Sequence, residues 1–384
     1  MMKLVMHKSG YFTVFSAQYG KEGVMLTKNI SVNDIRAGMI MAADAVGAGG
    51  TVVVPKSTVL SQRYMARLAT AGVKTICVNI PDYIATPEEL RESAPQENRI
   101  KDTQEYQDFR RDLLAVAGEL SEVFERLMMN PRANINSDDL VRSLKDLSDR
   151  YGGTIHVLDL LQASRDFDDS IYIHTVGVCL ISIIIGIKAQ FTEEQLHELI
   201  LCSIFHDIGK ITIPEELLNK QGRLTEDELE EIRSHTTLGY SLLSQTQLPE
   251  HVSLCALYHH ERFDGSGYPD HLTGQKIPFY ARYVAIADVY YAMTSKRPYR
   301  EDICTFDVVS AFEKDGYSKY DVAGLIPFLN CLAQSFIGSH VILNDGTDGK
   351  IIMLNERLTR PIIKIGPDFV DLMKHTELEI IKVM

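Results

Sequence analysis

Between residues 170 and 335 the sequence has an almost unbroken helical pattern, in which five successive predicted helices carry histidines or aspartates among apolar neighbours. Burying a charged or polar side chain without a partner is costly, so these groups need compensation inside the fold. A helical bundle that gathers them at one place in its core provides it, and metal ions are the cheapest compensation. The side chains are His174, His206, Asp207, His235, His259, His260 and Asp288.

Helix-start signals place each of these side chains on an element. Two capping boxes, which begin at Thr192 and Thr225, and prolines at 249 and 278 mark four helix starts. We expect His235 to lie inside the helix that starts at Thr225. The others are expected inside helices (His174, Asp288) or at helix ends (His206, Asp207, His259, His260).

Taken one at a time, these side chains have ordinary structural explanations. A single histidine such as His174 in an apolar helix is usually a satisfied core residue, and His206 could be an imidazolium at a helix C-terminus. His259 and His260 could lie on the surface, and Asp288 could be an isolated buried acid. The explanations fail together, because one helical region would then bury many polar groups without mutual compensation.

Seven ligands are too many for one ion, but they suit two ions if Asp207 bridges them. The remaining ligands then divide into His174, His206 and Asp288 for one ion, and His235, His259 and His260 for the other. Two ions roughly 3.5 to 4 Å apart can activate a bridging hydroxide and stabilise both the attacking and leaving oxygens of a phosphoryl displacement. Mixed imidazole and carboxylate ligation favours iron or manganese and leaves zinc, nickel and cobalt open.

Several segments of this region resemble the HD-GYP family of cyclic-dinucleotide phosphodiesterases, within the HD-domain superfamily of metal-dependent phosphohydrolases. They are HDIGK at 206–210, the following IPEELLNKQGRLTEDE, HHERFDGSGYP at 259–269 and ADVYYAMTSKRPYR at 287–300. The resemblance covers roughly residues 165–335, and HHERFDGSGYP is highly specific. It implies a helical HD-type bundle that hydrolyses cyclic di-GMP to linear pGpG, with GMP as an alternative end product.

The resemblance also implies roles for residues around the metals. Asp207 and Lys210 become catalytic, since Lys210 is similar to the family lysine that contacts the scissile phosphate; the alternative is a solvated lysine. Arg297 and Arg300 match cations that face the substrate, although surface arginines beside a proline are nearly as good an explanation. The loop 264–269 becomes a wall of the metal pocket, through Gly267, Tyr268 and Pro269.

Two positions depart from the family pattern. Some members bind a third metal through a glutamate four residues before the first histidine, where this chain has Ser170, so we predict two ions. The neighbouring Asp169 would lie about 100° round the helix. Tyr291 stands where the family usually has aspartate, which keeps open a catalytically silent cyclic-dinucleotide sensor or adaptor. A hydrolase for another phosphate ester, or for a mixed GMP-AMP cyclic dinucleotide, is a further alternative.

The flanking segments complete a mainly α architecture. We expect a small α+β module at 1–80, with strands at 51–54 and 75–80 and a helix that Gly72 ends, then a linker at 81–104. A helical connector at 105–165 precedes the catalytic domain at 166–335, and a β-rich segment at 336–384 closes the chain. The apolar spacing of the connector favours a bundle helix over a dimerising stalk, so a homodimer through it is the alternative.

Composition limits the partners. A formal net charge of −13 argues against nucleic-acid polymers and anionic membranes, so an anionic substrate needs a local group of cations. The start has no uninterrupted apolar core of a signal peptide, and the longest apolar run, 176–187, is shorter than the roughly 20 residues that span a bilayer. The six cysteines are scattered and form no CxxC pair. We expect a cytoplasmic protein with reduced thiols.

Overall fold

The chain divides into two compact units, Met1–Arg99 and Ile100–Met384, which are described separately. The structure is a computed structural model. It describes residues 2–6, 12–20, 23–32, 40–47, 52–56, 58, 60, 64, 67–68, 71–79, 100–101, 103–152, 155–164, 170–220, 222–294 and 305–383.

The first unit contains a five-stranded sheet in the order β1-β2-β3-β7-β4, with antiparallel neighbours, and a separate β5-β6 pair. The strands predicted at 51–54 and 75–80 are present in their described residues, 52–54 and 75–79, and the described part of the predicted helix is helical at 64 and 67–68. Gly72 has a φ of +69°, a conformation that ends helices. The strands are β1 Met2–Met6, β2 Phe12–Gly20, β3 Gly23–Ser31, β4 Ile40–Met41, β5 Ala45–Val46, β6 Val52–Val54 and β7 Thr75–Asn79. Most of the predicted linker, 81–99, lies outside the described residues.

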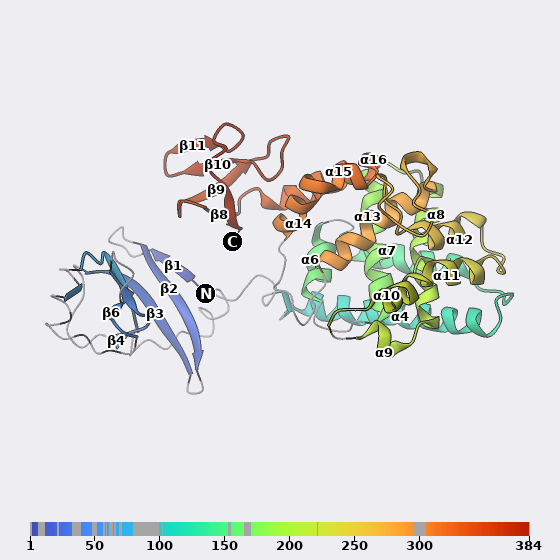
Figure 1. Ribbon diagram of the computed structural model, residues 1–384, viewed down its shortest axis with the longest axis horizontal. Coiled ribbons are helices and arrows are strands. Elements are labelled where there is room, and N and C mark those ends of the chain that lie inside the picture. The colour runs from blue at the N-terminus through green and yellow to red at the C-terminus, as the bar shows by residue number, and fades with distance from the viewer. Residues whose placement is uncertain are drawn as a thin grey trace. The chain divides into compact units, whose positions relative to one another are not determined.

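The second unit is mainly helical, as predicted, and ends in a small sheet (Figure 1). Its longer helices are α4 Gln104–Met129, α5 Ser137–Arg150, α6 Ile155–Ala163, α7 Ile171–Lys188, α8 Glu193–Phe205, α10 Glu226–Arg233, α11 His235–Leu243, α12 Glu250–Tyr258, α13 Phe279–Thr294, α14 Thr305–Ala311 and α16 Val322–Ala333. Short elements are η2 Ile208–Thr212, α9 Glu215–Leu218, η3 Gly274–Lys276, η4 Phe312–Gly316, α15 Tyr317–Lys319 and η5 Gln334–Phe336.

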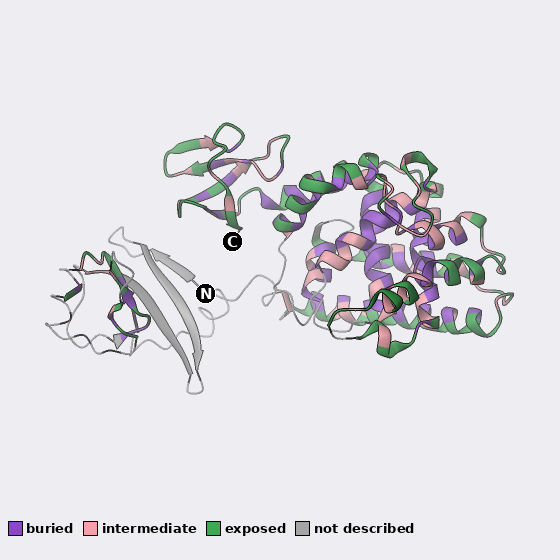
Figure 2. Ribbon diagram, in the orientation of Figure 1, coloured by how far each residue is buried: buried purple, intermediate pink, exposed green. Residues whose placement is uncertain are grey.

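Helix α7 runs through the middle of this unit, where it packs against α8, α13, α4 and α16 (Figure 1). It is 18 residues long and apolar on all sides, which makes it, among the described helices, the one long and apolar enough to cross a membrane. In the fold 72% of that segment is buried inside the protein, and Figure 2 shows it as a mostly buried helix. A helix apolar all round is expected at the centre of a bundle.

Local signals start the helices that carry the site. Thr192 caps α8 and Thr225 caps α10, each in a capping box with both reciprocal hydrogen bonds, as predicted. Pro249 precedes α12 as its N-cap residue. One expectation was wrong: the helix from Thr225 does not continue through His235. It ends at Arg233, with Ser234 as the C-cap residue whose hydroxyl donates to the carbonyl of Glu231, and a new helix begins at His235.

The apolar stripe of α4 is buried within its own unit. Its buried residues recur every three or four positions and belong to the same hydrophobic core as α7. They are Tyr106, Phe109, Leu113, Val116, Ala117, Leu120, Phe124 and Leu127. The stripe therefore has a partner inside this chain.

The β-rich end forms a five-stranded antiparallel sheet in the order β11-β10-β9-β8-β12, as predicted for this segment. Glu313 joins it to the helices, because its carboxylate accepts hydrogen bonds from the backbone N–H groups of Leu358 (2.6 Å) and Thr359 (3.2 Å). The strands are β8 His340–Leu343, β9 Asp348–Met353, β10 Ile362–Ile365, β11 Asp368–Asp371 and β12 Ile380–Val383.

Candidate metal centre

Five helices bring the seven predicted side chains to one place. His206 caps the C-terminus of α8, and Asp207 follows it at the start of η2. His235 is the first residue of α11, and His259 caps the end of α12 with His260 directly after it. The other two lie inside helices, His174 on α7 and Asp288 on α13.

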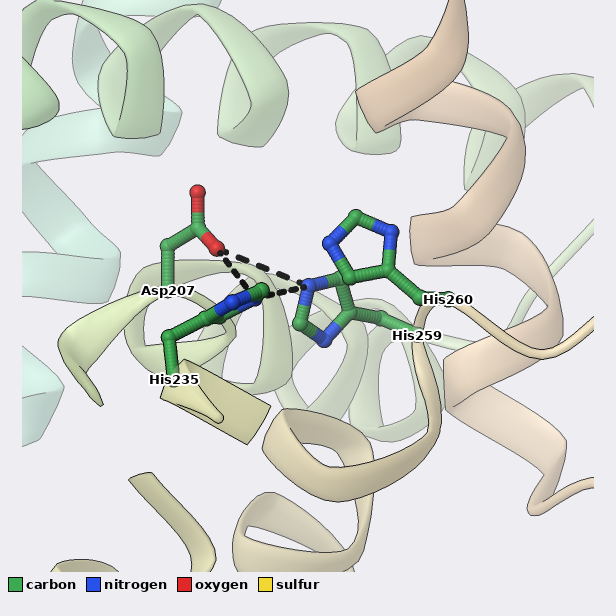
Figure 3. A group of neighbouring side chains, drawn as sticks. All are labelled: Asp207, His235, His259 and His260. Atoms are coloured by element: carbon green, nitrogen blue, oxygen red, sulfur yellow. Dashed lines mark hydrogen bonds and ion pairs between the residues drawn. The ribbon is translucent and has the colours of Figure 1, made fainter. Parts of the chain in front are cut away.

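Asp207 lies at the centre of the cluster and each of its oxygens faces two histidines. Its Oδ2 lies 3.3 Å from Nε2 of His174 and 3.3 Å from Nε2 of His206. Its Oδ1 lies 3.3 Å from Nε2 of His235 and 3.5 Å from Nε2 of His259. Figure 3 shows this second side, with Asp207 and His235 facing His259. The carboxylate thus has one oxygen for each of two groups.

Asp288 and His260 complete the two groups. Oδ1 of Asp288 lies 3.3 Å from Nε2 of His174, and its Oδ2 lies 3.8 Å from Nδ1 of His260. The ligand atoms of Asp207, His235, His259 and His260 all lie within 4.8 Å of one another, and so do those of His174, His206 and Asp207. Apart from Asp288, which borders both groups, this is the division expected from the sequence.

Three of the histidine rings are oriented by backbone carbonyls. Nδ1 contacts a carbonyl oxygen one turn earlier in His206 (Ser203, 2.7 Å), His235 (Ile232, 2.6 Å) and His259 (Ala256, 3.0 Å). A carbonyl only accepts, so each Nδ1 carries the proton and donates it. Nε2 of each ring is then left with its lone pair aimed at Asp207, the arrangement that a metal-ligating histidine needs.

The cluster fits a metal because its polar atoms are buried without partners of their own. Within the described part of the chain, Nε2 of His174, Nε2 of His206 and Oδ1 of Asp207 are buried and make no hydrogen bond. Such atoms cost free energy unless something else satisfies them. Imidazole nitrogens and carboxylate oxygens are ligands that divalent transition metals accept.

Burial and charge set the protonation states that ligation needs. Burial lowers the pKa of His259 to about 4 and, with the adjacent His259 ring, holds the pKa of His260 well below its usual range. Burial opposes ionisation of Asp207, but Lys210 and His206 outweigh it and hold its pKa well below its usual range. His259 and His260 are therefore neutral beside an ionised Asp207 carboxylate at neutral pH.

Lys210 is a cation that pairs directly with the central carboxylate. Its Nζ lies 2.5 Å from Oδ2 of Asp207, and its side chain is 23% exposed. It follows Asp207 in the short helix η2, so one turn of 3-10 helix positions both. Arg297 and Arg300, the other predicted substrate contacts, lie outside the described residues.

The loop with Gly267, Tyr268 and Pro269 closes one side of the cluster. The Tyr268 ring stacks on the His260 ring, with 4.8 Å between centroids and 26° between planes. At Gly267 the loop passes so close to the preceding chain that an added Cβ would lie 2.4 Å from Cα of Glu261. Tyr268 therefore packs on a candidate ligand.

Two residues of this side went unrecognised in the sequence. Glu261 is 2% exposed, and its carboxylate accepts from the backbone N–H groups of Asp270 (2.8 Å) and Leu272 (3.0 Å), which fixes the loop. Arg233 places its guanidinium carbon 5.2 Å from the centroid of the Tyr268 ring, with 42% of its side chain exposed. The sequence did contain a signal for Arg233. It is a cation two residues before the candidate ligand His235, and an anionic substrate needs local positive charge.

Ser170 has a local structural role. It is the N-cap residue of α7, where its hydroxyl accepts from the backbone N–H of Ile173 at 3.4 Å. Hydroxyl capping of this kind satisfies a backbone donor at a helix start. The adjacent Asp169 lies outside the described residues.

Comparison with known proteins agrees with this site. Residues 178–324 match the family model described as HD domain. The chain is 39% identical over 178 residues to the cyclic di-GMP phosphodiesterase response regulator RpfG of Xanthomonas campestris, covering 45% of this chain and 46% of that protein. It is 31% identical over 233 residues to the cyclic di-GMP phosphodiesterase PA4108 of Pseudomonas aeruginosa, covering 60% and 55%. Over 117 residues it is 42% identical to 3'3'-cGAMP-specific phosphodiesterase 1 of Vibrio cholerae, covering 30% and 27%.

Residues 178–324 are thus similar to HD domains, the class whose phosphohydrolases depend on metal. The resemblance to the HD-GYP family that the motifs carry is confirmed. The chain spans about half the length of the first two relatives, 46% and 55%.

Proposed function

We propose that this protein is a metal-dependent phosphodiesterase that hydrolyses cyclic di-GMP to pGpG, with GMP as an alternative end product. One observation carries the proposal: the two oxygens of Asp207 face two separate groups of histidines at 3.3 to 3.5 Å. Such a carboxylate is suited to bridging two ions, as two-metal phosphoryl-transfer sites require.

Two ions are proposed, with iron or manganese preferred over zinc, nickel or cobalt. His174, His206, Asp207 and Asp288 would hold one, and Asp207, His235, His259 and His260 the other. When bound, the ions activate water and stabilise the charge on the phosphoryl oxygens. Ser170 supports two ions rather than three, because its hydroxyl is engaged in capping α7.

The chain's own cations and rings act on the rest of the substrate. Lys210, whose ammonium lies 2.5 Å from Asp207, is proposed to contact the scissile phosphate. Arg233 carries a partly exposed guanidinium beside Tyr268, which offers planar donors to a second phosphate or a guanine edge. Arg297 and Arg300 are proposed as further substrate contacts.

Cyclic di-GMP is preferred because two of the compared relatives are named for it. One relative is named for 3'3'-cGAMP, so the mixed dinucleotide is the main competitor within the same chemistry. The two substrates differ in one base, and the pocket residues that contact the edge of this base decide between them.

The test is product analysis coupled to metal analysis. The full chain is loaded anaerobically with Fe(II), Mn(II), Zn(II), Ni(II) or Co(II) in separate samples, and the bound metal is counted. Each sample is incubated with cyclic di-GMP, 3'3'-cGAMP and a generic phosphodiester. We expect about two ions per chain and release of pGpG from cyclic di-GMP with iron or manganese.

Three results would contradict the proposal. Tight binding of cyclic di-GMP with no turnover under any metal would favour a silent sensor or adaptor. Much faster turnover of the generic ester would favour a different phosphohydrolase. A metal content near three would overturn the two-ion assignment.

Location, assembly and domain limits are also proposals. We propose a cytoplasmic enzyme whose catalytic domain spans 166–335, between a connector at 105–165 and an appendage at 336–384. A homodimer through the connector would use surfaces other than the apolar stripe of α4, which is buried within its own unit. Sedimentation of the full chain tests this point.

A further inference from the structure

The five histidines of the cluster differ in what orients their rings. His206, His235 and His259 each donate from Nδ1 to a backbone carbonyl. Within the described chain His174 and His260 make no such hydrogen bond, and each packs against a tyrosine instead. One of these tyrosines, Tyr268, belongs to the loop motif. The other, Tyr291, occupies a position where the sequence departs from the family pattern.

Tyr291 contacts His174 edge to face. The ring centroids are 5.1 Å apart and the planes meet at 81°, an arrangement that aromatic pairs favour. Tyr291 lies three residues after Asp288 on α13, so the two side chains project from neighbouring positions of one helix face. Since Oδ1 of Asp288 lies 3.3 Å from Nε2 of His174, α13 contacts that imidazole twice.

Gly177 provides the space that the Tyr291 ring occupies. A Cβ added at Gly177 would lie 2.0 Å from Cε2 and 2.6 Å from Cδ2 of Tyr291, so the ring rests directly on the backbone of α7. Gly177 is three residues after His174 on that helix, which places the ring against both. An aspartate at 291 is too short to fill this space, so the tyrosine and the glycine form a matched pair.

We propose that Tyr291 is a positioning residue that holds His174 in the orientation needed to bind one of the two metal ions. The inference rests on the metal site of the proposed function. Seated on Gly177, the ring blocks rotation of the His174 imidazole, so Nε2 stays directed at Asp207 and Asp288. Tyr291 thereby does for His174 what backbone carbonyls do for three of the other histidines.

The experiment measures metal binding by two variants of the full chain, each with one substitution at Tyr291. Tyr291→Phe keeps the aromatic ring. Tyr291→Leu removes the ring and leaves an apolar side chain in its place. We expect Tyr291→Leu to bind one of the two ions about 10- to 100-fold more weakly, the range for loss of a group that orients a ligand, and to bind the other as the wild type does. Tyr291→Phe should match the wild type for both ions.

Tyr283 offers a matched control on the same helix. It too packs on a glycine, since a Cβ added at Gly324 would lie 2.8 Å from its ring, but its aromatic neighbours include Phe191, with ring centroids 4.8 Å apart. Tyr283→Leu should lower stability and leave both metal affinities unchanged. In a second variant, Gly177→Ala, the added methyl displaces the Tyr291 ring, and the same single ion should bind more weakly.

The outcomes separate this inference from the proposed function. If the wild type binds two ions and Tyr291→Leu binds both with wild-type affinity, the positioning role is refuted and the phosphodiesterase proposal stands. Equal weakening of both ions in Tyr291→Leu and Tyr283→Leu would show a general packing effect and also refute it. A wild type that binds no metal refutes the proposed function together with the inference.

Discussion

Asp207 is the residue on which the two halves of the centre depend. It is 1% exposed, its two oxygens serve different histidine groups, and Lys210 pairs with one of them. A carboxamide at this position would keep the shape of the side chain but would lose the charge and turn one of the two faces into a donor. A single atom change thus affects both groups at once.

We predict that Asp207→Asn lowers phosphodiesterase activity at least about 100-fold and reduces the metal content below one ion per chain, since removing even an outer partner costs 10- to 100-fold. Metal analysis and product release measure the two effects. Glu198→Gln is the control, because Glu198 is a carboxylate on the preceding helix α8 that pairs at 2.5 Å with His251, a histidine outside the cluster. Wild-type metal content in Asp207→Asn would refute the bridging role.

At this scale the sequence predicts the polar residues well and their packing poorly. The seven side chains could be found because buried histidines and aspartates are costly and their helices have clear start signals. The seating of Tyr291 on Gly177 could not, because a tyrosine and a glycine on different helices carry no local pattern that links them. Arg233 was missed because cation–π contact depends on where the loop of Tyr268 folds.

At the scale of elements, the closest approach in the site is between η2 and α11. A Cβ at Gly209 would lie 1.9 Å from the carbonyl oxygen of His235 and 2.7 Å from the backbone nitrogen of Gly239. The two backbones can meet only because position 209 has no side chain. The same contact explains why the sequence did not predict the break at Ser234. The break lies next to a tertiary contact, between Gly209 and His235, that no local sequence signal encodes.

We predict that Gly209→Ala separates η2 from α11, lowers the free energy of unfolding by about 1–3 kcal/mol as overpacking does, and weakens metal binding through His235. Urea unfolding and metal titration measure these effects. Gly118→Ala is the matched control, since a Cβ there meets nothing within 4 Å in the middle of α4. It should stabilise the protein by about 0.5–1 kcal/mol. Equal effects of the two variants would contradict the close approach.

A charged group also links α4 to the end of α5. Oδ2 of Asp112 accepts from Tyr151 (2.9 Å) and Arg150 (2.6 Å). Burial raises the pKa of Asp112, but these hydrogen bonds and Arg111 outweigh it and hold the pKa below its ordinary value of 3.8. A carboxyl group with a lowered pKa stabilises the fold above its unfolded pKa, and the contribution is lost as the pH falls through the folded value.

We predict that Asp112→Asn is less stable than the wild type by about 1–2 kcal/mol at pH 7, as for hydrogen bonds to a charged group. The difference should shrink as the pH is lowered below 3.8, where the wild-type carboxyl group takes up a proton. Urea unfolding at a series of pH values measures it. Asp108→Asn removes an exposed ion pair with Arg111 and should change stability by less than about 1 kcal/mol at any pH. A pH-independent difference for Asp112→Asn would contradict the assignment.

At the scale of the whole molecule, the chain combines two units. The sequence distinguishes them by their composition and by the spacing of their apolar residues. The change from helical spacing to short strands after residue 335 predicts the C-terminal sheet, which the structure contains. That this sheet packs into the same core as the helices was not predictable, because Val341 and Ile363 alternate like any half-buried strand residues. In the described residues the metal-capable clusters belong to the second unit.

Metal should therefore stabilise one unit and leave the other unchanged. Binding to the folded state alone adds RT ln(1 + [L]/Kd), about 2.7 kcal/mol per ion when free metal is 100 times Kd. We predict that Mn(II) at this level raises the protection of α7 amides against hydrogen exchange by that amount for each ion, and that a chelator reverses it. Amides of β7 in the first unit should not respond, and Asp207→Asn should abolish the response of α7. A site confined to elements of the second unit can protect only the unit that unfolds with it. Equal protection of α7 and β7 by metal would therefore contradict this prediction.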